Sequence, residues 1–134
     1  MVSKIDNAFA FQEKALGLRA YRQQVLAGNI ANADTPNYQA RDFDFSQALK
    51  EAVAGRESSS LKMATTDSQH ISVGTQSGPV RLLYSTPSQS SVDGNTVDMD
   101  IERSKFSENA IRYEAGVTFV SGNVKTLLSA IQGN

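Results

Sequence analysis

The sequence predicts a mainly α protein in which long N- and C-terminal helices pair as a coiled coil. Two observations lead to this fold class. Apolar residues recur at helical spacing at both ends of the chain, and the segment between them is rich in Ser and Thr and poor in large apolar residues. We expect one axial domain over residues 1–134, comprising an N-terminal helix with an Asn-rich exit (1–38), an extended, partly β middle segment (39–97) and a C-terminal coiled-coil helix (98–134).

The N-terminal helix carries a wide apolar stripe. At 100° per residue the stripe covers about half of the helix circumference, more than the roughly 100° that a surface helix usually buries. One partner would not cover such a face, so we expect contacts on more than one side. The helix should end near Asn32, because Pro36 and its neighbours in Asp34-Thr35-Pro36-Asn37 favour a turn. The large apolar residues of the stripe are Ile5, Phe9, Leu16, Leu26 and Ile30.

The sequence of the middle segment predicts little regular secondary structure there. Ser46 is positioned to cap a short helix that ends at Gly55 and folds back onto the first helix. Beyond it, residues 56–95 contain only two short patches that could form strands, 71–73 and 80–84. The segment buries too little apolar surface to offset the roughly 1–2 kcal/mol per residue that backbone ordering costs. We therefore expect it to be flexible in the free chain.

The C-terminal helix should begin between Thr96 and Asp100. Asp98, Asp100 and Glu102 there place negative charge at the positive end of the helix dipole. Downstream, eight apolar residues recur in alternating steps of four and three, a period of 3.5 residues that is typical of a coiled-coil seam. These seam residues are Phe106, Ala110, Tyr113, Val117, Val120, Val124, Leu127 and Ile131.

The seam needs another helix to lie along. Leu16, Leu26 and Ile30 of the N-terminal helix are the residues we expect to face it. An intramolecular two-helix hairpin would satisfy this pattern, and so would assembly with other subunits. The sequence favours assembly, because the N-terminal stripe is too wide for one partner.

An Asn-rich string marks the exit of the N-terminal helix, Ala27-Gly28-Asn29-Ile30-Ala31-Asn32-Ala33-Asp34-Thr35-Pro36-Asn37-Tyr38. The amides of Asn29 and Asn32 can both donate and accept hydrogen bonds, while Ile30 and Ala31 allow close helix approach. On composition alone an ordinary helix terminator explains the string better than a contact with other chains.

This string resembles the signature of flagellar axial proteins, which is close to Ala-Asn-Asn-Ile-Ala-Asn-Ala-Asn-Thr-Pro-Gly-Tyr. Gly28, Asp34 and Asn37 depart from it mildly, since Asp and Asn both serve in turns. The segments 11–20, 39–45 and 95–115 are also similar to the proximal-rod proteins of the bacterial flagellar basal body.

The resemblance implies a structural subunit of the proximal rod, whose terminal helices pack into a helical tube that transmits torque and forms part of the export channel. It implies as partners copies of the chain, homologous rod proteins, the rod-base adaptor protein, the rotor ring and the flagellar export gate. It also implies a periplasmic rod location reached through the flagellar type III apparatus without a cleaved signal peptide. A cytoplasmic coiled-coil binding module or export chaperone is the alternative. The expected assembly interface comprises Phe9, Leu16, Leu26, Asn29, Ile30, Ala31, Asn32, Thr35, Pro36, Tyr38 and the eight seam residues.

Composition and motifs argue against other functions. The net charge of −1 and pI of about 5.8 do not favour binding to nucleic acid or to an anionic membrane surface. No stretch approaches the roughly 18 consecutive apolar residues that a membrane-spanning helix needs, so we expect no membrane insertion. His70 is the only histidine, there is no Cys, and Asp98, Asp100 and Glu102 lack the glycine and the bidentate Glu of a calcium loop. No Gly-x-Ser-x-Gly elbow or phosphate-binding glycine loop occurs. We therefore predict no enzyme activity and no catalytic, cofactor or metal site.

Overall fold

A computed structural model describes residues 2–55, 80–86 and 92–133, with the backbone alone at residues 2–5 and 8. Three helices and one pair of short strands make up this part of the chain. In order, they are α1 (Val2–Ala31), β1 (Arg41–Asp42), α2 (Phe45–Val53), β2 (Leu83–Tyr84) and α3 (Met99–Gln132). Helix α1 ends one residue before the predicted Asn32, and α3 begins within the predicted window.

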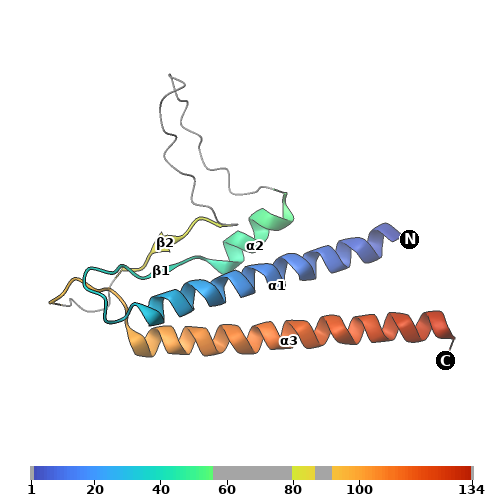
Figure 1. Cartoon of the computed structure of the whole chain (residues 1–134). Helices are drawn as coiled ribbons and strands as arrows, with labels where there is room; N and C mark the ends of the chain where they lie inside the picture. The colour runs from blue at the N-terminus through green and yellow to red at the C-terminus, as the bar shows by residue number, and fades with distance from the viewer. Residues whose placement is uncertain (1, 56–79, 87–91, 134) are drawn as a thin grey trace, which may run out of the picture.

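The two long helices form an antiparallel hairpin, with both chain termini at the same end (Figure 1). Three contacts define their register. Leu16 packs so closely on Gly116 that an added β-carbon would lie 2.9 Å from Leu16 Cδ2. Further along, the amide of Asn109 donates to Gln23 Oε1, and that of Asn29 donates to Glu102 Oε2. The predicted pairing of the terminal helices is confirmed.

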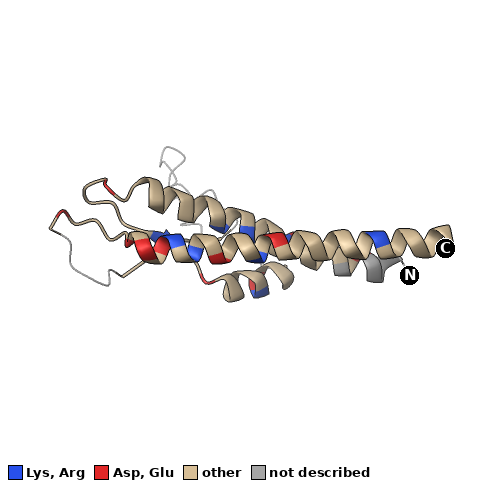
Figure 2. Cartoon of the chain, turned by 90° about the horizontal axis from the view of Figure 1, so that it is seen from below, with Lys and Arg blue, Asp and Glu red and all other residues tan. Residues whose placement is uncertain are grey.

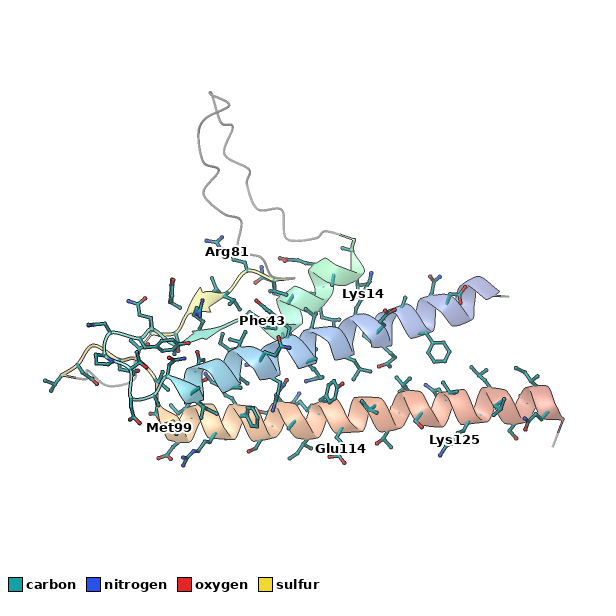
Figure 3. All side chains as sticks on the ribbon, viewed as in Figure 1. Lys14, Phe43, Arg81, Met99, Glu114 and Lys125 are labelled. Atoms are coloured by element: carbon teal, nitrogen blue, oxygen red, sulfur yellow. The ribbon has the colours of Figure 1, made fainter. Side chains whose placement is uncertain are left out.

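The opposite side of α1 packs against the middle of the chain (Figure 1). Leu18 contributes to a buried cluster with Phe43, Ala48 and Val80. The rings of Tyr21 and Phe43 lie 5.9 Å apart, and Phe43 is directed between α1 and the strand pair (Figure 3). Helix α1 thus has partners on two sides, as the width of its apolar stripe predicted. Half-buried apolar residues around the cluster are Tyr21, Phe45, Leu49, Ala52 and Leu82.

The cap of α2 corrects one detail of the prediction. Asp44, rather than Ser46, is the N-cap residue. Its Oδ1 accepts hydrogen bonds from the backbone N–H groups of Ser46 at 2.8 Å and Gln47 at 3.1 Å. A carboxylate at this position satisfies two free N–H groups and also complements the positive end of the helix dipole. The helix does fold back onto α1, as expected.

The strand pair is short. Arg41 pairs with Tyr84, and Asp42 with Leu83, in antiparallel register. The prediction of a strand over 80–84 is therefore correct for its last two residues. The second predicted patch, 71–73, and His70 lie outside the described residues, as do most of the Ser/Thr-rich segment and its expected flexibility.

The loops at the far end of the hairpin are held together by Asn95, which is buried. Its Nδ2 group lies within hydrogen-bond distance of the carbonyl oxygens of Asn32 at 3.0 Å, Ala33 at 2.7 Å and Thr35 at 2.8 Å. Gly94 and Asn37 both have positive φ, 72° and 59°. One side chain thus binds carbonyl oxygens of the turn that follows α1, and it ties the exit of α1 to the entry of α3.

Candidate assembly surface

The α1–α3 hairpin divides into two halves that differ in burial. We call residues 16–31 with 99–116 the closed half, and residues 6–15 with 117–132 the open half. Leu26 in the closed half is fully buried, and Asn29 and Asn109 are 1% and 2% exposed. The predicted contact residues Leu16 and Ile30 are half-buried there, as are Phe106 and Ala110, whereas Tyr113 is 40% exposed.

Asn29 forms the centre of a buried polar network in the closed half. Its Nδ2 donates to the carbonyl oxygen of Arg41 at 2.7 Å and to Glu102 Oε2 at 2.9 Å. Its Oδ1 accepts from the backbone N–H of Arg41 at 3.1 Å and lies 3.4 Å from the hydroxyl of Tyr38. The hydrogen-bonding capacity of this amide is therefore used inside the subunit. Glu102 is itself 3% exposed and pairs with Lys105 at 3.0 Å.

A second polar contact links the helices about two turns further along α3. Asn109 Nδ2 donates to the carbonyl oxygen of Arg19 at 2.9 Å and to Gln23 Oε1 at 2.6 Å. Because both contacts are acceptors, they establish which end of the Asn109 amide is the nitrogen. The oxygen of this amide is buried without a hydrogen-bond partner among the described residues.

Sequence reasoning missed Glu102 and Asn109 as contact residues. Glu102 lies four residues before Phe106 and adjoins Arg103, the position that the alternating steps give next, and Asn109 adjoins Ala110. A helical projection of the C-terminal helix that included the residues before Phe106 would have placed both side chains on the same face as the seam. Their polar character led us to interpret Glu102 only as a helix-start acid, a role that the neighbouring Asp98 performs by accepting from the N–H groups of Asp100 and Ile101.

An ion-pair cluster joins α1, β1 and α3. Arg22 donates two hydrogen bonds to Asp42, at 2.9 Å and 2.8 Å, and Lys105 Nζ lies 3.7 Å from the same carboxylate. Burial opposes ionisation of Asp42, but the hydrogen bonds from Arg22 and from the Phe43 N–H, with the charge of Lys105, hold its pKa below the usual value. The hydrogen bonds between Arg22 and Asp42 raise the pKa of Arg22, although burial acts to lower it.

The open half leaves most of the predicted seam uncovered. Val120 and Phe9 are half-buried. The other seam residues are more accessible, with 43% of Val117, 48% of Val124, 36% of Leu127 and 82% of Ile131 exposed. Glu114 and Lys125 project from the face turned away from α1 (Figure 3). The apolar stripe is therefore larger than the surface that one copy of α1 covers.

The Asn-rich exit divides in the same way. Asn32 and Tyr38 are half-buried, and Asn32 Nδ2 donates back to the carbonyl oxygen of Gly28 at 2.8 Å. Ala31, Thr35 and Pro36 are exposed. The part of the string available to other molecules is thus the end of α1 and the turn that follows it.

Other kinds of site are not evident in the part of the chain that the structure describes. No group of three or more His, Cys, Asp or Glu side chains in these ranges could hold a metal ion. None of the helices in the same ranges has a stretch apolar enough to span a membrane. An elongated helical hairpin with an uncovered apolar seam is the architecture of a structural subunit that assembles through its helices.

Comparison with known proteins identifies the family. Residues 9–39 match the family model described as flagella basal body rod protein. The chain is 48% identical over 136 residues to the flagellar basal body rod protein FlgB of Salmonella typhimurium strain LT2, covering 99% of both chains. It is 47% identical to FlgB of Escherichia coli K12 over 135 residues and 46% identical to FlgB of Proteus mirabilis HI4320 over 137, each covering 98% of both chains.

The chain belongs to the FlgB family of flagellar basal body rod proteins. It is therefore a structural protein of the flagellar rod and not a member of an enzyme family. The alternative interpretation, a cytoplasmic binding module or export chaperone, finds no support among these relatives.

Proposed function

We propose that this rod subunit assembles through its terminal helices into a helical tube that transmits torque and forms part of the export channel. The observation that carries the proposal is the uncovered seam of the open half, from Val117 to Ile131. Burying a large apolar side chain contributes roughly 1.5–3 kcal/mol, so a neighbouring helix that covers several of these residues gains substantial stability. The gain is available only in an assembly, because α1 of the same chain leaves them exposed.

The interface is the predicted set of residues, which contribute in two ways. Leu26, Asn29 and the half-buried residues hold the two helices of one subunit in register. The exposed residues contact neighbouring subunits. This second group comprises Ala31, Thr35, Pro36, Tyr113, Val117, Val124, Leu127 and Ile131.

The neighbours we propose are copies of this chain, homologous rod proteins and, at the base of the rod, the adaptor protein, the rotor ring and the export gate. The subunit occupies the periplasmic rod and reaches it through the flagellar type III apparatus without a cleaved signal peptide. These partners and this route follow from the family resemblance of both ends of the chain. We also propose the division into an N-terminal part (1–38), a middle segment (39–97) and a C-terminal helix (98–134) within one axial domain.

Quantitative mass spectrometry of salt-washed, detergent-extracted basal bodies tests the proposal. A fixed ratio of the chain to a rotor-ring subunit, retained after the wash, is the expected result. Absence from basal bodies with free protein in the cytoplasm would overturn it.

A charge substitution tests the seam itself. Leu127→Asp should abolish assembly and motility, because burying an unpaired carboxylate costs several kcal/mol. Lys125→Asp introduces the same side chain two residues away, on the face turned from α1 (Figure 3), and should leave motility largely intact. Motile cells carrying Leu127→Asp would refute the role of the seam.

A further inference from the structure

A groove of about 530 Å³ opens beside the closed half, where α1, α3, β2 and the start of α2 meet. Four cationic side chains from the two long helices line it, together with aromatic rings and the carboxylates of Asp42, Asp44 and Glu108. The residues used in the argument are Arg19, Arg22, Phe45 and Arg112.

Arg19 is the groove guanidinium that lacks a carboxylate partner among the described residues. Arg22 is paired with Asp42, and Arg112 with Glu108. The Arg19 guanidinium instead lies 4.2 Å above the centre of the Phe45 ring. Burial, then the charges of Arg112 and Arg22, lower the pKa of Arg19, and Glu108 opposes the shift. A carboxylate brought to this site would relieve the repulsion and complete the pairing.

The far end of the hairpin has complementary chemistry. Residues 31–40 and 92–102 contain no Lys or Arg, and Asp34, Asp93 and Asp100 are exposed there. Figure 2 shows acidic residues, coloured red, on both loops at this end. The exposed turn Asp34-Thr35-Pro36-Asn37 offers a carboxylate and, three residues on, an amide donor.

We propose that the Arg19 groove of one subunit binds the Asp34–Asn37 turn of a second copy of this chain. Asp34 would pair with Arg19, the groove guanidinium whose carboxylate partner is missing among the described residues. The inference rests on the proposed function and deepens it by assigning one contact between copies. Because two different surfaces meet, the contact is heterologous and repeats without closing, as an open helical assembly requires.

Disulfide trapping in isolated basal bodies tests the contact, and the natural absence of Cys leaves only the introduced thiols to react. Cells would produce two tagged forms of different mass, one with Thr35→Cys and one with Ser46→Cys at the groove. A mixed disulfide dimer is the expected result. The control pair replaces Ser46→Cys with Arg103→Cys, which is exposed on α3 outside the groove, and should give about tenfold less dimer.

Charge variants establish that Arg19 and Asp34 make the contact. Arg19→Gln should lower the dimer yield about tenfold, the change that loss of one charge-assisted pair produces. Combining Arg19→Glu with Asp34→Arg should restore the yield, because the pair is then reversed, whereas Arg103→Gln should not change it. An unchanged yield in Arg19→Gln would overturn the proposal.

Two further outcomes separate this inference from the proposed function. If the chain is present in basal bodies but the Thr35 and Ser46 positions do not crosslink, the inference fails and the rod assignment stands. If a single chain carrying Ser46→Cys and Ser68→Cys forms an internal disulfide in the rod, its own middle segment occupies the groove and the inference fails. Absence of the chain from basal bodies would overturn the rod assignment itself.

Discussion

The closed and open halves of the α1–α3 hairpin are built from the same two helices, yet they differ in what covers them. The closed half contains the fully buried Leu26 and the polar contacts of Asn29 and Asn109. The open half carries the more regular apolar seam, and Ile131 is still 82% exposed there. A heptad pattern thus identifies the residues that share a face, but it does not reveal whether the same chain covers that face.

The polar contacts explain why the closed half has one register. An apolar seam can slide by a heptad at little cost, whereas a displaced Asn29 would leave Glu102 buried without its partner. The open half has no such contact between α1 and α3 among the described residues. We infer that polar contacts specify the fold of the subunit. We propose that the exposed part of the apolar seam, in the open half, contacts neighbouring subunits.

The largest expected difference between the halves is in the loss of unfolding free energy when an apolar side chain is truncated. Leu26→Ala should lower the free energy of unfolding by about 2–5 kcal/mol, because it leaves a cavity at a fully buried position. Ile131→Ala should change it by less than about 0.5 kcal/mol, since the side chain is mostly exposed. Urea unfolding of the purified chain, followed by circular dichroism, measures both. Equal losses would remove the distinction between the halves.

Replacing Asn29 tests the polar network. Asn29→Leu should destabilise the chain by about 1–3 kcal/mol, because Glu102 and the Arg41 backbone lose partners in a buried site. Asn32→Leu is the matched control, since Asn32 donates only within the exit of α1 and should cost less. Urea unfolding midpoints compare Asn29→Leu with Asn32→Leu. The midpoints of Asn29→Leu, Glu102→Gln and the double variant measure the coupling between Asn29 and Glu102. Strict additivity would show that Asn29 and Glu102 do not act together.

Asp42 should make the closed half sensitive to acid. Its pKa is lowered in the folded chain, so its contribution is complete above the unfolded pKa of about 3.9 and is lost as the pH falls through the lower folded value. Asp42→Asn should cost about 1–2 kcal/mol at pH 6 and less at pH 2. Chemical unfolding at these pH values measures the change. The exposed Asp93→Asn should behave like the unsubstituted chain, and equal pH dependence of both variants would contradict the assignment.

The smallest effect is expected at a helical glycine of the open half. Gly122→Ala should stabilise α3 by about 0.5–1 kcal/mol, because alanine favours helix and nothing lies within 4 Å of the added methyl group. Gly116→Ala should gain less, since its methyl group would meet Leu16 at 2.9 Å. Thermal unfolding compares the two variants. A larger gain for Gly116→Ala would mean that Leu16 does not pack as described.

Local signals predicted the elements of this fold well. Pro36 marked the end of α1, the acids around Asp98 marked the start of α3, and the apolar period predicted that both ends of the chain form long helices. These features depend on neighbours in the sequence, so a sequence contains them. The prediction of Ser46 rather than Asp44 as the cap was wrong, because either residue type caps a helix well and backbone geometry decides between them.

Contacts between distant residues were the part that the sequence did not reveal. Glu102 and Asn109 are polar, and a polar residue at a helix surface is usually solvated, so their burial depends on partners far away in the chain. The Arg19 groove depends in the same way on Phe45, Tyr84 and Arg112, which the fold brings together. Which exposed seam residues meet a neighbour remains a prediction of the same long-range kind.

The placement of the middle segment has a consequence for how this fold can diversify. Gly55, after α2, and Val80, in the buried cluster, flank the segment 56–79, and both lie on the side of α1 opposite to α3 (Figure 1). A longer insertion between these points would not displace the helix pair, and each doubling of a flexible loop costs only about 0.6 kcal/mol. The helix pair can therefore keep its structure and its assembly surfaces when a whole domain is inserted between α2 and β2.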